Sequence, residues 1–116
     1  MLNIDNDNNI YLTRGDTCIL DIEITDKDGD PYIMTPNDEL IFAVRRLAGK
    51  GEVLIRKEIS VPVITLTTND TKNLSFGKYK FDIHLYNSGS HVLDTFIADK
   101  IFELGEEVHD FEHNNR

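Results

Sequence analysis

The residue types best suited to chemistry in this chain are four histidines and a single cysteine. The histidines are His84, His91, His109 and His113. A tetrahedral zinc site needs three or four ligands at defined spacing, and the sequence offers no cysteine pair to complete one. His109 and His113 would share one face of a helix, but they stand in a polar, glycine-free segment. We therefore expect exposed surface histidines and no metal site.

An acidic turn, Asp26-Lys27-Asp28-Gly29-Asp30, superficially resembles the start of a calcium loop. The helix–loop–helix calcium motif requires glycine at its sixth position and a bidentate glutamate at its twelfth. Counted from Asp26, however, Gly29 is the fourth residue and Asn37 the twelfth. Asp-Gly is a strong hairpin-turn signal, so we interpret this segment as a solvated turn. The similarly acidic Asp5-Asn6-Asp7-Asn8-Asn9 is interpreted as a frayed N-terminus.

No nucleophile stands in a catalytic pattern. Cys18 alternates with Leu20, Ile22 and Ile24, which is typical of a small buried residue in a strand. The sequence contains no Gly-x-Ser-x-Gly elbow and no glycine-rich phosphate loop. Arg14-Gly15-Asp16 matches an integrin-binding tripeptide, but its glycine is explained by a bend between strands. We expect no catalytic residues, no cofactor and no enzymatic activity.

Size and charge narrow the class of protein. The chain has 116 residues, enough for one domain with its own core. A net charge of -9 disfavours nucleic acid and anionic membranes as partners, because both attract clustered Lys and Arg. The first seven residues lack the basic and apolar regions of a signal peptide. We therefore expect synthesis in the cytoplasm, with any exit from the cell by lysis or within a particle.

Alternation of apolar and polar residues predicts a chain built mainly of strands. The clearest case has Tyr79, Phe81, Ile83 and Leu85 on one face. The strands are expected over residues 8–14, 17–25, 32–34, 40–46, 53–59, 63–67, 79–86, 91–98 and 100–104. This pattern indicates an all-β fold, an antiparallel immunoglobulin-like β-sandwich of about seven to nine short strands. Residues 1–105 form the domain and residues 106–116 a polar, acidic tail.

A corner or a single helical turn is expected at 35–39, and a helical turn is expected at 68–75. Thr35 and Asp38 have a spacing similar to a capping box, and Thr68 or Asn69 could cap the second turn. A flexible tip is expected at 48–52. Lys57 interrupts the apolar positions of the following strand, Val53–Ile59, so we expect an edge strand or a bulge there.

A hairpin follows the strand at 79–86, and a one-residue slip in its register would turn every side chain to the other face. Gly89 is expected at positive φ in its turn. In the return strand, Leu93, Thr95 and Ile97 are expected to face inward, with His84 opposite Asp94. Tyr79, close after Gly77, resembles a tyrosine corner, in which the hydroxyl bonds back to the preceding turn.

The order of strands and turns resembles a known family. The segments that carry the resemblance are Ile10–Thr17, Asp26–Tyr32, Leu40–Arg46, Leu54–Lys57, Ile64–Thr67, Asn69–Leu74 and Gly77–Ile83. Together they look like the N-terminal domain of phage and prophage baseplate upper proteins, over residues 8–108. The resemblance implies a compact β-sandwich that serves as a structural module of the tail tip, usually oligomeric and without catalytic residues. The chain ends soon after this domain, so we expect a stand-alone protein or partners on separate chains.

Two function classes remain besides an enzyme, which would require a pocket with convergent polar groups. The first is a non-enzymatic virion structural protein, a baseplate or tail adaptor that mediates protein–protein assembly. Its expected partners are other virion or tail proteins and further copies of itself, and its expected location is the virion. The alternative is a small carbohydrate- or ligand-binding β-sandwich module. That alternative needs an exposed aromatic platform, for which Tyr11, Tyr32 and Tyr86 are the candidates.

Overall fold

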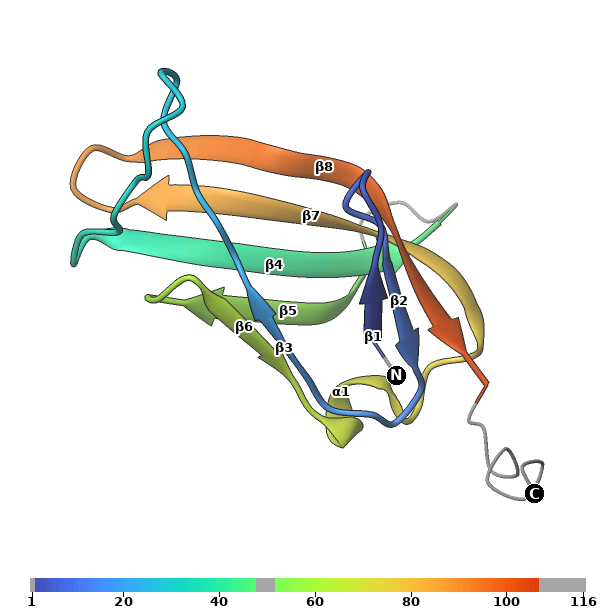
Figure 1. Cartoon of the computed structure of the whole chain (residues 1–116). Helices are drawn as coiled ribbons and strands as arrows, with labels where there is room; N and C mark the ends of the chain where they lie inside the picture. The colour runs from blue at the N-terminus through green and yellow to red at the C-terminus, as the bar shows by residue number, and fades with distance from the viewer. Residues whose placement is uncertain (1, 48–51, 107–116) are drawn as a thin grey trace.

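The computed structural model describes residues 2–47 and 52–106, which form eight strands and one short helix (Figure 1). The elements are β1 (Leu2–Ile4), β2 (Ile10–Thr13), β3 (Cys18–Asp21), β4 (Asp38–Arg46), β5 (Val53–Ile59), β6 (Val63–Leu66), α1 (Thr68–Thr71), β7 (Gly77–Asn87) and β8 (Val92–Gly105). The predicted all-β class is confirmed. The predicted tip at 48–52 and the tail at 106–116 fall almost wholly outside the described residues.

The strands form two sheets of unequal width. The large sheet has six strands in the order β1-β2-β8-β7-β4-β5, and the small sheet pairs β3 with β6. Figure 1 shows β3 and β6 crossing one face of the large sheet. The described ladders are antiparallel except that β2 runs parallel to β8, which departs from the antiparallel arrangement expected from the sequence. The architecture is therefore sandwich-like, with a mixed large sheet.

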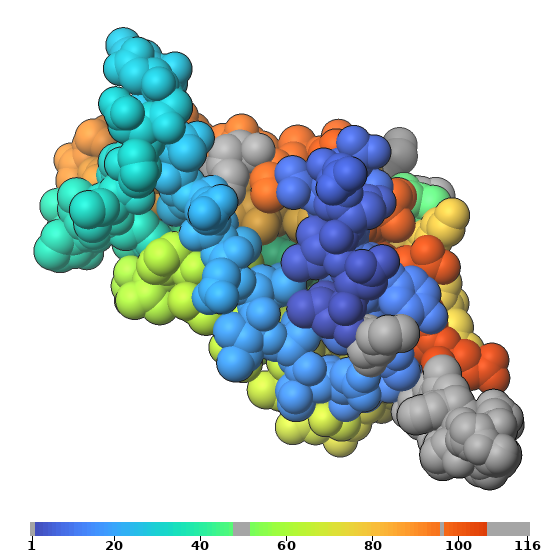
Figure 2. All heavy atoms as spheres, in the orientation of Figure 1, coloured from blue at the N-terminus to red at the C-terminus, as the bar shows by residue number. Residues whose placement is uncertain are grey.

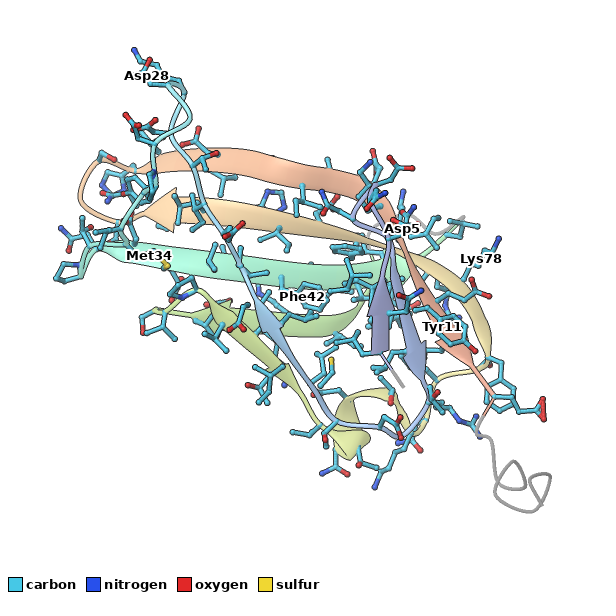
Figure 3. The ribbon with its side chains drawn as sticks, in the orientation of Figure 1. Asp5, Tyr11, Asp28, Met34, Phe42 and Lys78 are labelled. Atoms are coloured by element: carbon cyan, nitrogen blue, oxygen red, sulfur yellow. The ribbon has the colours of Figure 1, made fainter. Side chains whose placement is uncertain are left out.

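The core lies between the two sheets and follows from the alternation of apolar residues along each strand. Phe42 on β4 is fully buried, and its ring centroid lies 5.6 Å from that of Phe81 and 6.4 Å from that of Phe102. From the small sheet, Leu20 and Ile64 complete the same apolar cluster. Figure 3 places Phe42 near the middle of the molecule.

Local polar contacts fix the chain entering β7. The Tyr79 hydroxyl donates a hydrogen bond to the Ser75 carbonyl oxygen at 2.7 Å, as the resemblance to a tyrosine corner predicts. At α1 the cap is Thr67, one residue before the predicted Thr68. The Thr67 backbone N–H donates to the Asp70 carboxylate at 2.7 Å, and the Lys57 ammonium lies 3.0 Å from the same carboxylate.

The β7–β8 hairpin differs from the prediction in its register. Thr95 lies opposite His84, and Asp94 lies opposite Leu85, so the predicted pairing of His84 with Asp94 was wrong. Thr95 and Leu93 consequently lie on the outer face, where Leu93 is 54% exposed. His91, rather than Gly89, has positive φ in this turn.

Three further predicted strands differ from the structure. The strands expected at 91–98 and 100–104 form the single strand β8, in which Asp99 at φ 55° accommodates an irregularity and donates its N–H to the Asp82 carboxylate at 2.8 Å. Residues 32–34 form no strand, since only a Thr25–Pro31 bridge pairs there.

The N-terminus is ordered rather than frayed. Strand β1 pairs with β2, and the turn that joins them is closed by Asp5. The Asp5 carboxylate accepts hydrogen bonds from the backbone N–H groups of Asp7 and Asn9, each at 2.9 Å. These bonds place β1 beside β2 as the outermost strand of the large sheet.

Replacing Phe42 should destabilise the domain severely. Phe42→Ala removes a fully buried ring from the shared core and should lower the free energy of unfolding by about 3–5 kcal/mol. Urea unfolding followed by circular dichroism measures this change. Ile33→Ala is the matched control, since Ile33 is 83% exposed, and it should change stability by less than about 0.5 kcal/mol. Equal effects of the two substitutions would contradict the assigned core.

Candidate partner-binding surface

The residues singled out for chemistry are dispersed in the structure. Cys18 is buried, and burial raises the pKa of its thiol, as expected of a core residue. His84 Nδ1 lies 2.7 Å from the Thr95 hydroxyl, and His91 Nδ1 lies 3.1 Å from the Tyr86 hydroxyl. Among the described residues, no three His, Cys, Asp or Glu side chains converge to hold a metal ion. His109 and His113 lie outside the described residues.

The acidic turn uses its first carboxylate to fix its own backbone. Asp26 Oδ1 accepts hydrogen bonds from the N–H groups of Asp28 at 2.9 Å and Asp30 at 3.0 Å. Gly29, at φ 85°, donates its N–H to the Asp26 carbonyl oxygen. Residues 25–32 form a projecting segment that we call the arm, and Figure 3 shows Asp28 at its outer tip. The segment is the solvated turn predicted from the sequence.

The three candidate tyrosines do not form one aromatic platform. The Tyr32 hydroxyl donates to Asp38, and Asp38 also binds the Asn87 side chain. Tyr86 precedes Asn87 on β7 and so projects from the opposite face of the sheet. Tyr11 lies on β2, where its ring packs against the backbone of Gly105. The structure therefore places these side chains at separate positions.

Asp38 is the centre of a buried polar network at the start of β4. Its carboxylate accepts hydrogen bonds from the Tyr32 hydroxyl at 2.5 Å, the Thr35 N–H at 2.8 Å and the Asn87 amide at 2.9 Å. The bond from Thr35 has the capping-box geometry that the sequence predicts, although it closes a turn and not a helix. Only 3% of Asp38 is exposed, so this network ties the arm to the end of the large sheet.

The same network controls the ionisation of its members. Burial alone would raise the pKa of Asp38, but the hydrogen bonds from Thr35, Tyr32 and Asn87 outweigh burial and lower the pKa to about 2. The hydrogen bond to Asp38 raises the pKa of Tyr32. Asp38 is thus a structural carboxylate that stays ionised across the physiological range.

A hollow of about 610 Å³ lies beside the small sheet. We call it the interstrand groove, and its lining residues are Ile4, Asn8, Ile10, Leu20, Asp21, Ile22, Glu23, Ile24, Thr25, Phe81, Ile83 and Ile97. Figure 2 shows the surface hollowed between the blue segment that contains β3 and the darker blue N-terminal hairpin. The groove has an apolar floor from β7 and β8, and its lining also includes the exposed residues Asp21 and Glu23.

A second hollow of about 590 Å³ shares the lining residues Ile24 and Thr25 with the first. It lies toward the hairpin end of β7 and β8, where Leu85, Val92 and Asp94 line it. Ile24 and Thr25 therefore border both hollows. Because the Tyr32 N–H donates to the Ile24 carbonyl oxygen at 2.8 Å, the Asp38 network holds this segment in place.

Sequence reasoning missed the groove, although one signal pointed to it. The alternation that starts at Thr17 continues to Thr25, whereas β3 pairs with β6 only as far as Asp21. When the alternation of a strand continues beyond its last paired residue, apolar residues are expected past the end of the pairing. Ile22 and Ile24 are such residues, and both are half-buried against the core.

Comparisons of the chain with family models, with curated proteins and with solved structures return no match. The resemblance to the baseplate domain therefore stays a prediction based on strands and turns. In the described part of the chain, no helix has the length and apolar character needed to cross a bilayer.

The Asp38 network predicts an acid-sensitive contribution to stability. Because folding lowers the pKa of Asp38 to about 2, its contribution is present above the unfolded-state pKa of about 4 and is lost as pH falls toward 2. Asp38→Asn should lower the free energy of unfolding by about 2 kcal/mol at pH 7 and by progressively less between pH 4 and pH 2. Urea unfolding across this pH range measures the difference.

Asp28→Asn provides the matched control for this experiment. It makes the same chemical change at the exposed tip of the arm (Figure 3), and it should leave the pH profile of the wild-type chain unchanged. A difference between Asp38→Asn and wild type that stays constant from pH 7 to pH 2 would contradict the assigned role of Asp38.

Proposed function

We propose that this chain is a non-enzymatic structural module of a phage or prophage tail, a baseplate or tail adaptor that works through protein–protein contacts. The resemblance of its strand-and-turn order to the baseplate upper protein domain supports the proposal. The all-β fold is compatible with it. On this proposal the chain resides in the virion and binds other tail proteins and further copies of itself.

The observation that carries the proposal is the interstrand groove together with the strand edges beside it. The small sheet has only two strands, and β1 is the outermost strand of the large sheet. Open strand edges invite pairing with another chain, and soluble proteins generally protect them. An adaptor uses such edges in assembly, whereas the carbohydrate-binding alternative depends on an aromatic platform that the dispersed tyrosines do not supply.

Purified particles test the location. Particles from a lysate of the strain that encodes this chain are separated on a density gradient, and each fraction is quantified by mass spectrometry. The chain should sediment with the major tail proteins at a fixed ratio. An abundant host cytoplasmic protein is the control and should stay at the top of the gradient. Recovery of the chain with that host protein, while the tail proteins sediment, would refute the proposal.

Light scattering during size-exclusion chromatography tests self-association separately. The purified chain of 13.3 kDa should elute as a closed oligomer with a mass that is a fixed multiple of this value across a tenfold dilution. A monomer at every concentration would remove self-association from the proposal and leave only partners on other chains.

A further inference from the structure

Two unpaired strand edges border the interstrand groove. Strand β3 pairs with β6 along one edge, and the residues that line the groove include none from β6. The groove therefore lies along the other edge of β3. Strand β1 pairs with β2 on one side only and contributes Ile4 to the same groove. Figure 1 shows β1 on the side of β3 away from β6.

The pairing of β3 determines which backbone groups point toward the groove. The Ile22 N–H donates to the Pro62 carbonyl oxygen at 2.9 Å. In an antiparallel pair, residues that exchange hydrogen bonds alternate with residues that do not. The intervening residues Asp21 and Glu23 therefore direct their N–H and C=O groups to the opposite edge, which borders the groove. No hydrogen bond satisfies the Glu23 backbone within the described residues.

An added strand that pairs with the open edge of β3 would extend the small sheet along the groove. If the same strand also paired with β1, the two sheets would become one, in the order β6-β3-guest-β1-β2-β8-β7-β4-β5. Such a guest would place alternate side chains on the apolar floor formed by Phe81, Ile83 and Ile97. Pairing on both sides would remove two open edges.

The negative charge of the groove indicates which kind of segment would bind there as an added strand. Among the described residues, the charged ones that line it are Asp21 and Glu23, with no Lys or Arg. The second hollow adds three aspartates and one cation: Asp26, Asp38, Asp94 and Lys27. Complementary charge favours association and discriminates against acidic partners. Residues 106–116 include four carboxylates and one Arg, so the chain's own C-terminal segment is acidic and has the wrong charge.

We propose that the interstrand groove binds an extended segment of a partner protein as an added β-strand, and that this segment alternates apolar residues with Lys or Arg. The main-chain bonds to Asp21 and Glu23 supply affinity, and the alternate side chains supply specificity. This inference rests on the proposed function in one respect, which is that the partner is a tail protein.

A displayed library of random peptides about ten residues long provides the probe. Selection on the immobilised full chain should enrich peptides that alternate Ile, Val or Phe with Lys or Arg. The best enriched peptide, made synthetically, should bind the chain in fluorescence anisotropy and should slow hydrogen exchange at the amides of Asp21 and Glu23. Enrichment of acidic peptides, enrichment of none, or protection confined to other strands would overturn the proposal.

Proline substitutions test the pairing itself. Glu23→Pro removes a donor that points into the groove and leaves the β3–β6 bonds in place, so it should weaken peptide binding about tenfold or more. Thr65→Pro is the matched control. Thr65 lies opposite Ile19, and the same alternation directs its N–H to the edge of β6 away from the groove. That variant should bind within about twofold of wild type.

Equal losses in the two proline variants would refute strand addition at this edge. If a proline variant fails to fold, the amide protection measured on the wild-type chain still decides the question. The substitution pair Asp21→Asn and Glu23→Gln should weaken binding and reduce its salt dependence. If the chain self-associates and Glu23→Pro abolishes that self-association, a second copy of the chain occupies the groove. This result would overturn the proposal that a basic segment of a partner protein binds there.

The proposal and the virion location fail in distinguishable ways. If the chain stays with host proteins in the gradient but binds the selected peptide through β3, the groove is a strand-binding site in another assembly. If the chain sediments with tail proteins and binds no peptide, the tail role holds and the groove is not its contact.

Discussion

The structure depends on covering one apolar face of the six-stranded sheet. Phe42, Phe81 and Phe102 meet on that face, and burial of such rings is the dominant favourable term in folding. The cover consists of only two strands, β3 and β6. A two-stranded layer is too narrow to cover six strands, so the chain uses the extension of β3 over residues 22–25 to shield the remainder. The interstrand groove is the part of this face that the cover leaves accessible.

The position of that extension is set by polar contacts at the other end of the molecule. Asp38 binds Tyr32, and the Tyr32 N–H binds the Ile24 carbonyl oxygen. Through this chain of contacts a buried carboxylate on β4 holds Ile24 over β7 and β8. Buried polar groups that are fully hydrogen-bonded specify a single arrangement of the segments that they connect. The network therefore holds the segment that borders the groove, and its members Tyr32, Asp38 and Asn87 line the second hollow.

The sequence predicts the elements better than their connections. The alternation of apolar and polar side chains predicted β4, which contains Phe42, and β7, which contains Phe81, because this alternation follows directly from which residues are buried. The alternation could not predict the parallel pairing of Leu12 with Leu104, because that pairing joins distant parts of the chain and leaves no local pattern. The sequence pattern also missed the continuity of β8, in which Asp99 at φ 55° accommodates an irregularity in the pairing with β7. The groove was missed because it lies beside residues 22–25, whose alternation continues past the last residue of β3 that pairs with β6.

Residue-resolved hydrogen exchange of the free protein tests most directly whether β3 presents an open edge to the groove. Exchange rates should alternate from one amide to the next along β3 and its extension. The amides of Leu20 and Ile22 should exchange slowly, because Leu20 pairs with β6 and Ile22 donates to Pro62, the residue before β6. The amides of Asp21 and Glu23 should exchange at rates close to those of an unstructured chain. Protection of all four amides alike would show that the edge is already covered and would contradict the account.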